Sequence, residues 1–131
     1  MNFVDDGDKT GIIEIGGVVM EILPNADKAV IPIEKFVNYA LNIDHMDGRH
    51  KALVFKDVLG YTADNADILM SGIREGIYNF PANYKGKTQH GNKYEIIMQI
   101  TGPTGRTASV VTGWIIDIDA NIPRLVTAYV D

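Results

Sequence analysis

The stretch Lys93-Tyr94-Glu95-Ile96-Ile97-Met98-Gln99-Ile100, together with residues 101–106 and 107–116, decides the fold of this chain. In the first stretch, alternation places four aromatic or apolar side chains on one face: Tyr94, Ile96, Met98 and Ile100. The last stretch alternates in the same way, with Ala108, Val110, Thr112, Trp114 and Ile116 together. The sequence Thr101-Gly102-Pro103-Thr104-Gly105-Arg106 between them is typical of a turn. This pattern predicts an antiparallel hairpin with strands over 93–100 and 107–116.

A third strand is predicted over residues 124–130, after a turn at 117–123. Alternation predicts two faces, with Leu125, Thr127 and Tyr129 on one and Val126, Ala128 and Val130 on the other. Consecutive strands joined by short turns predict a three-stranded antiparallel meander. The preceding residues 79–92 are predicted to form a loop, because they contain Pro81, Gly86 and Gly91.

Three helices are predicted upstream of these strands. Pro32 suits a first helical turn, because its missing N–H needs no partner there, and apolar spacing predicts a helix over 33–41. A second helix is predicted over 49–59, with Gly60 as the residue that ends it. Thr62 is the expected N-cap of a third helix, which runs to residue 77.

The N-terminal residues 10–23 contain two β-branched runs around Gly16-Gly17. They predict either a hairpin or one strand with a break. Residues 1–9 are polar and acidic, and we expect them to be flexible. The chain, 1–131, is therefore predicted to be a single α+β domain: an N-terminal β-hairpin and about three helices packed on one face of a C-terminal antiparallel sheet.

Composition limits the functions of this chain. Of its 131 residues 46% are hydrophobic and none is cysteine, which predicts a globular core and excludes disulfide and thiolate chemistry. The net charge of -5 argues against a broad electrostatic surface for nucleic acid, although it allows a small basic patch. The sequence has neither a signal peptide nor a run of about 18 apolar residues, so we expect no membrane association and a cytoplasmic location.

Chemically active side chains are concentrated in residues 44–51, where the second predicted helix begins. His50 lies in the first turn of that helix and is able to transfer a proton near neutral pH. Arg49 and Lys51 are able to hold an anionic group, helped by the free N–H groups of the helix start. His45, in the preceding loop, is a further candidate. Both histidines have a simpler interpretation as surface or capping residues.

Further candidates lie in the strands. Arg106 and Arg124 open two of them, and Thr127 and Tyr129 share a predicted face. Helices packed over the sheet could bring His50 near Arg106, Thr127 or Tyr129. Such a group suffices for RNA cleavage without a metal: one side chain deprotonates the 2′-OH, cations stabilise the phosphorane, and another group protonates the leaving oxygen. No metal or other cofactor is predicted, since the chain has no cysteine and no helical i, i+4 histidine pair.

A set of short segments spread over residues 22–130 carries a resemblance to a known family. These segments are Pro24-Asn25-Ala26-Asp27-Lys28-Ala29, residues 35–41, Gly48-Arg49-His50-Lys51-Ala52 with Phe55, Leu59-Gly60, Thr101-Gly102-Pro103, and Pro123-Arg124-Leu125-Val126-Thr127-Ala128-Tyr129. Together they resemble a family of small bacterial domains of unknown function. The resemblance implies a shared fold and brings no established activity.

A second resemblance concerns the plan of the chain, in which helices with a histidine precede an antiparallel sheet that ends in Val126-Thr127-Ala128-Tyr129. This plan is similar to that of the barnase, EndoU, colicin and RelE-like ribonuclease toxins. The resemblance implies a set of candidate catalytic residues, with His50 on the helix: His50, Lys51, Arg106, Thr127 and Tyr129. The candidate substrate-binding residues are Arg49, His45 and Arg124.

Three functions stay open from the sequence. The first is a metal-independent ribonuclease of toxin type, which cleaves RNA and is paired with a neutralising protein. The second is a non-catalytic immunity-like or adaptor domain, whose acidic balance suits a basic protein partner. The third is an enzyme that acts on a small molecule or nucleotide in a pocket between the helices and the sheet. An exposed sheet edge would also allow a homodimer.

Overall fold

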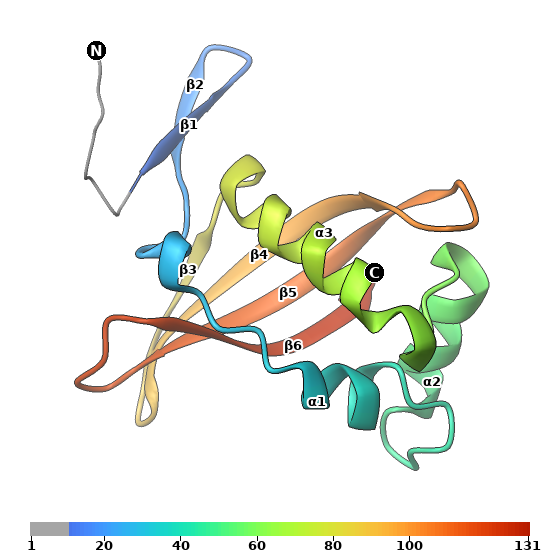
Figure 1. Ribbon diagram of the computed structural model, residues 1–131. Helices are drawn as coiled ribbons and strands as arrows, with labels where there is room; N and C mark the ends of the chain where they lie inside the picture. Colours follow the sequence, from blue (N-terminus) through green and yellow to red (C-terminus); the bar gives the residue numbers. More distant parts are fainter. Residues whose placement is uncertain (1–10) are drawn as a thin grey trace.

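The computed structural model describes residues 11–131 and has an α+β architecture (Figure 1). Strands β1 (Ile12–Ile15) and β2 (Val18–Glu21) form a separate hairpin. The larger sheet has the order β3-β4-β5-β6 and is antiparallel throughout; its strands are β3 (Asn83–Thr88), β4 (Gly91–Thr101), β5 (Thr107–Asp117) and β6 (Pro123–Val130). The predicted fold class is confirmed. The prediction of flexibility for residues 1–9 lies outside the described residues.

Helical segments separate the two sheets. A short turn, η2 (Ala26–Lys28), precedes α1 (Ile33–Lys35), which continues as η3 (Phe36–Ala40). The second helical segment joins α2 (Arg49–Val54) to η4 (Phe55–Leu59). In the third, η5 (Ala63–Asn65) leads into α3 (Ala66–Asn79). These segments confirm the three predicted helices, although η3 and η4 are wound with π-helical hydrogen bonds. Within residues 11–131, no helix is long and apolar enough to cross a membrane.

The predicted helix boundaries around residue 60 are also confirmed. Gly60 adopts a φ of 86°, which favours glycine, and ends the second helical segment. The Thr62 hydroxyl accepts a hydrogen bond from the Asp64 N–H at 3.3 Å, as expected of an N-cap. The Asn65 side chain in turn accepts one from the Thr62 N–H at 2.8 Å. These reciprocal bonds satisfy N–H groups that the start of a helix leaves without a partner.

One face of the larger sheet carries the hydrophobic core. Helix α3 crosses this face, and the segments α1–η3 and α2–η4 lie beside β6 (Figure 1). Large apolar side chains from α3, β4 and β5 are fully buried there: Leu69, Ile73, Ile77, Ile96, Met98, Val110 and Trp114. Gly76 allows α3 to approach β4, because a Cβ at this position would lie 2.5 Å from the Met98 sulfur. The predicted packing of helices on one face is therefore confirmed.

The hairpin predicted from residues 93–116 is the longest pairing in the sheet. It runs in one unbroken register from Gly91↔Asp117 to Thr101↔Thr107. Trp114 lies on the inner face and is inaccessible to solvent. The sequence of residues 10–23 predicts either a hairpin or one strand with a break. The structure shows the hairpin, because β1 and β2 pair antiparallel on either side of Gly16-Gly17.

The sequence-based loop over residues 79–92 is wrong in part, because it contains the edge strand β3 and the sheet has four strands instead of three. β3 shows no apolar alternation, and its side chains are exposed or half-buried. Its pairing with β4 shifts register between Tyr84 and Gly86, and Gly86 adopts a φ of 107°. Ladder hydrogen bonds to β4 therefore define this strand. Lys85 and Lys87 lie on it, and such charges disfavour pairing of an exposed edge with another chain. The homodimer stays a prediction.

The strict alternation predicted for residues 124–130 is also wrong. Trp114 pairs with Leu125, whereas Gly113 pairs with Thr127, so Val126 is an extra residue in a β-bulge. The bulge turns Leu125 and Ala128 to the same buried side, although they are three residues apart. Thr127 consequently does not share a face with Leu125.

A buried hydrogen-bond chain crosses the centre of the sheet. Thr112 is 0% exposed, and its hydroxyl donates to the Ile96 carbonyl at 2.8 Å. The same hydroxyl accepts a hydrogen bond from the Trp114 indole N–H at 2.9 Å. One threonine therefore satisfies two polar groups that would otherwise be unpaired inside the core.

We expect Thr112→Val to lower the free energy of unfolding by about 2 kcal/mol, because it keeps the shape of the side chain and leaves a buried indole N–H without a partner. Urea unfolding measures the change. In a Trp114→Phe background, which has no indole N–H, the same substitution should cost less. An equal cost in both backgrounds would contradict the coupling between Thr112 and Trp114.

The burial of Tyr61 leads us to expect that the protein loses stability at alkaline pH. It is 3% exposed, and burial raises the pKa of its phenol above the ordinary value. The contribution of the Tyr61 phenol to the free energy of unfolding is fully present below its unfolded-state pKa of about 10. It falls as the pH rises from that value toward the folded-state pKa, because the phenol ionises first in the unfolded chain. Tyr61→Phe should therefore lose less stability than the wild type between about pH 9 and pH 11. Urea unfolding at both pH values tests this, with the exposed Tyr78→Phe as control.

Candidate functional site

His45 organises the loop that leads into α2. Its Nδ1 accepts hydrogen bonds from the N–H groups of Asp47 and Gly48, both at 3.1 Å. Its carbonyl accepts the first helical bond, from the Arg49 N–H at 2.9 Å. Its ring packs edge-on against Tyr39, with 4.7 Å between the ring centroids. His45 therefore satisfies two N–H groups of the turn that leads into α2, whose N-cap residue is Gly48, and with Nδ1 as an acceptor its ring proton lies on Nε2.

His50 and Arg49 extend into solvent at the first turn of α2. Both residues are exposed, and neither side chain makes a polar contact within the described residues. Ala52 and Phe55 mark the buried face of this helix, and the helical repeat places His50 on the opposite side. The ring nitrogens of His50 are consequently accessible to a ligand that reaches the helix start from solvent.

Lys51 turns toward the last strand. Its Nζ lies 4.7 Å from the centroid of the Tyr129 ring in a cation–π contact. Both side chains are half-buried, and they join the first turn of α2 to the end of β6. This contact brings together two of the candidate catalytic residues.

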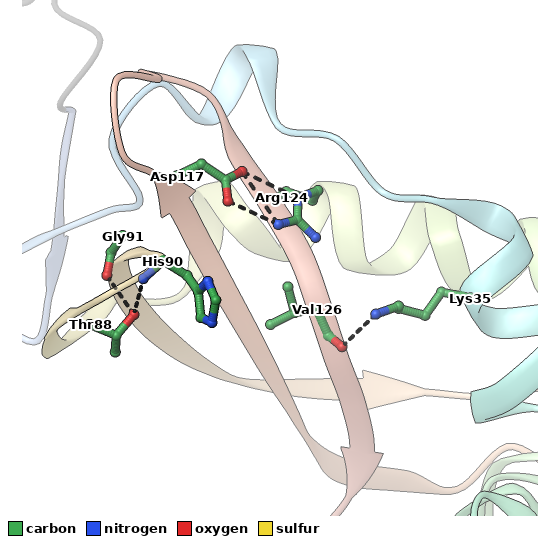
Figure 2. Close-up of polar contacts among 7 residues, drawn as sticks. All are labelled: Lys35, Thr88, His90, Gly91, Asp117, Arg124 and Val126. Carbon is green, nitrogen blue, oxygen red and sulfur yellow. Dashed lines mark hydrogen bonds and ion pairs between the residues drawn. The ribbon is translucent and has the colours of Figure 1, made fainter.

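A pocket of about 270 Å³ lies between η3 and β6. Helical and strand residues line it: Lys35, Phe36, Tyr39, Ala40, Leu125, Val126, Thr127 and Ala128. Lys35 crosses toward the strand and donates from Nζ to the Val126 carbonyl at 3.4 Å, at the bulge (Figure 2). Tyr39 connects this pocket to the start of α2, because its ring contacts His45 and its carbonyl packs against Gly48.

Arg106 lies at the other end of the second helical segment. Its guanidinium donates to the Asp57 carbonyl. In the same turn, the Thr104 hydroxyl donates to the Val58 carbonyl at 2.8 Å and the Thr104 N–H donates to the Leu59 carbonyl at 3.2 Å. The β4–β5 turn therefore satisfies three carbonyls at a helix C-terminus. Asp57 is eight residues from the helix start at Arg49, so Arg106 is separated from that start by roughly 12 Å along the axis, at about 1.5 Å per residue.

Arg124 lies at the start of β6, where it forms an ion pair with Asp117 at 3.0 Å (Figure 2). The neighbouring backbone is tied to Val30, whose N–H donates to the Pro123 carbonyl at 2.9 Å. Tyr129 is five residues further along the strand, which corresponds to roughly 16 Å. Arg124 therefore does not join the group around Lys51.

The structure thus brings together only part of the predicted set. Lys51 and Tyr129 are in contact, Thr127 lines the pocket beside them, and His45 reaches that pocket through Tyr39. Arg106 and Arg124 bind other parts of the fold. The sequence interpretation missed Lys35 and Tyr39, although their i, i+4 spacing on a predicted helix was a signal that both face the same side.

These features define a small α+β domain in which helices cover one face of a four-stranded antiparallel meander, with a pocket beside the last strand. Residues 22–131 match the family described as Domain of unknown function (DUF6883), and the chain belongs to this family. The predicted resemblance to a family of unknown function is confirmed. No curated protein and no solved structure matches the chain. The resemblance to ribonuclease toxins stays a prediction.

The two hydrogen bonds that His45 Nδ1 accepts lead to a stability prediction. His45→Ala should lower the free energy of unfolding by about 1 kcal/mol, because it leaves two N–H groups of the turn without their side-chain partner. His45→Asn should lose less, because its amide oxygen can accept from the same N–H groups. Urea unfolding measures both. His50→Ala is the matched control and should change stability by less than about 0.5 kcal/mol, and an equally small effect of His45→Ala would contradict the role of His45 in holding the turn.

Proposed function

We propose that this domain is a metal-independent ribonuclease of toxin type, and that RNA binds along the end of β6 and the first turn of α2. The observation that carries the proposal is the contact of Lys51 with Tyr129, next to a pocket that Lys35, Tyr39 and Thr127 line. Two cations and two tyrosines are gathered there from separate parts of the chain. Such a combination suits a ligand that has both phosphates and aromatic bases.

The charges favour a short, local contact with the nucleic acid. The chain as a whole has a net charge of -5, which opposes non-specific binding along a long duplex. Lys35 and Lys51 supply positive charge where a phosphate would bind, while Tyr39 and Tyr129 offer ring faces for unstacked bases. We therefore assign single-stranded RNA as the substrate. The proposal includes action on cellular RNA in the cytoplasm and a neutralising protein partner of the kind that a toxin-type enzyme requires.

His50 is the proposed proton-transfer group. His45 is poorly suited, because its Nδ1 is engaged by two N–H groups and its Nε2 already carries the proton. In the proposed reaction His50 takes the proton of the 2′-OH, the 2′-oxygen bonds to phosphorus, and the bond from phosphorus to the 5′-oxygen breaks. Lys51 stabilises the charge on the phosphorane, and water supplies the proton to the 5′-oxygen. The products have a 2′,3′-cyclic phosphate and a 5′-hydroxyl.

The test is incubation of the purified protein with total RNA in EDTA. We expect cleavage by the wild type, a loss of at least about 100-fold in His50→Ala, and a loss of at least about tenfold in Lys51→Met. Lys56→Met, an exposed lysine of η4, is the matched control and should retain full activity. Thermal unfolding of each variant confirms that it is folded.

Two outcomes would contradict this proposal. Cleavage that persists in His50→Ala would exclude His50 as the proton-transfer group. No cleavage by the folded wild type would exclude the ribonuclease, and RNA binding that Lys51→Met weakens would then define a non-catalytic RNA-binding domain.

A further inference from the structure

A second cavity, of about 470 Å³, lies where the end of β2 meets strands β3 and β4. It is at the end of the molecule opposite to α2 (Figure 1) and shares no residue with the pocket beside β6. Its lining combines tyrosine rings, one carboxylate and small apolar groups: Glu21, Ile22, Pro24, Ala82, Tyr84, Asn92 and Tyr94. The proposed ribonuclease does not use any of these residues.

Two tyrosines form a corner of this cavity. Tyr84 and Tyr94 are directly opposite each other on β3 and β4, with ring centroids 5.3 Å apart and an angle of 56° between the ring planes. The Tyr84 hydroxyl donates to Asn92 Oδ1 at 2.9 Å, which fixes the direction of that ring. Tyr84 is 56% exposed, so a ligand from solvent reaches the corner directly.

Glu21 provides the charge of the cavity. Its carbonyl accepts a hydrogen bond from the Ala82 N–H at 3.0 Å, which holds the end of β2 beside the start of β3. Among the described residues that line the cavity, Glu21 alone is charged. Burial raises the pKa of Tyr94, and Tyr84 and the charge of Glu21 raise it further. Tyr94 therefore stays a neutral phenol at neutral pH, with the carboxylate close to it.

We propose that this cavity binds an organic ammonium group, either the side chain of a lysine or a small alkylammonium ion. The face of a tyrosine ring carries negative electrostatic potential, so two tyrosine rings and a carboxylate in the lining of one cavity favour a cation over a neutral or anionic group. Ile22, Pro24 and Ala82 supply apolar surface for the methyl or methylene groups next to the nitrogen. An anionic ligand would instead be repelled by Glu21, which no lysine or arginine among the lining residues neutralises.

The first experiment is an NMR titration of the folded, ¹⁵N-labelled protein with choline. The probe for charge is 3,3-dimethyl-1-butanol, which has the shape of choline without its positive charge. We expect choline to shift the amide signals of Glu21, Ala82, Tyr84, Asn92 and Tyr94 in a saturable manner, and the neutral alcohol to bind at least about tenfold more weakly. Equal binding of choline and the neutral alcohol would overturn the proposal, and so would the absence of a saturable shift with both choline and the lysine compound of the third titration.

A third titration, with N-acetyl-lysine methylamide, identifies the source of the cation. Saturable binding of this compound at the same residues supports recognition of a protein lysine. Binding of choline alone supports a small quaternary ammonium ion.

Variants test the assignment of individual side chains. Glu21→Gln removes the charge of an exposed residue and should raise the Kd for choline at least about threefold, and Tyr84→Leu should do the same through loss of a ring face. The matched controls are Glu14→Gln in β1 and Tyr78→Leu in α3, which should leave the Kd unchanged. Unchanged binding in both Glu21→Gln and Tyr84→Leu would exclude this corner as the site.

Discussion

The structure depends on the continuous pairing of β4 with β5, which runs from Gly91↔Asp117 to Thr101↔Thr107. Its inner face buries Trp114, and Thr112 links the indole of that residue to the backbone of β4. The turn at the end of the same pairing binds the last carbonyls of the second helical segment. One hairpin therefore supplies the buried centre of the core and binds the C-terminal end of this helix.

The opposite end of that helix determines the candidate site. His45 binds two N–H groups of the turn before α2 and packs against Tyr39, while Lys51 extends to Tyr129 on the last strand. Since both ends are held, the first turn of α2 has one position beside β6. The bulge at Val126 then presents a carbonyl to Lys35, and the pocket lies between these elements.

Charge is distributed unevenly in this acidic chain. Lys35 and Lys51 lie beside β6, whereas the cavity at the far end of the sheet contains one carboxylate beside two tyrosines. The two proposals therefore assign opposite ligand charges to opposite ends of one small sheet. The net charge of -5 alone describes neither end. This separation allows the two proposed sites to be tested independently.

The sequence by itself determined the α+β class, the three helices and the central hairpin, because periods of 3.6 and two residues identify a buried face without knowledge of its partner. It did not reveal β3, whose residues lack that period, since its backbone hydrogen bonds to β4 define it. It also missed the bulge at Val126, which depends on the register between two strands.

For the candidate site, the sequence predicted a group at the helix start, with Arg49, His50 and Lys51, and further candidates on the last strand, with Thr127 and Tyr129. The tertiary structure alone decided which of them meet: Lys51 reaches Tyr129, whereas Arg106 binds a helix C-terminus and Arg124 binds Asp117. The physical reason is that residue type and spacing specify what a side chain can do and which face it occupies. The partner of a long, flexible cation depends on how distant segments pack against one another.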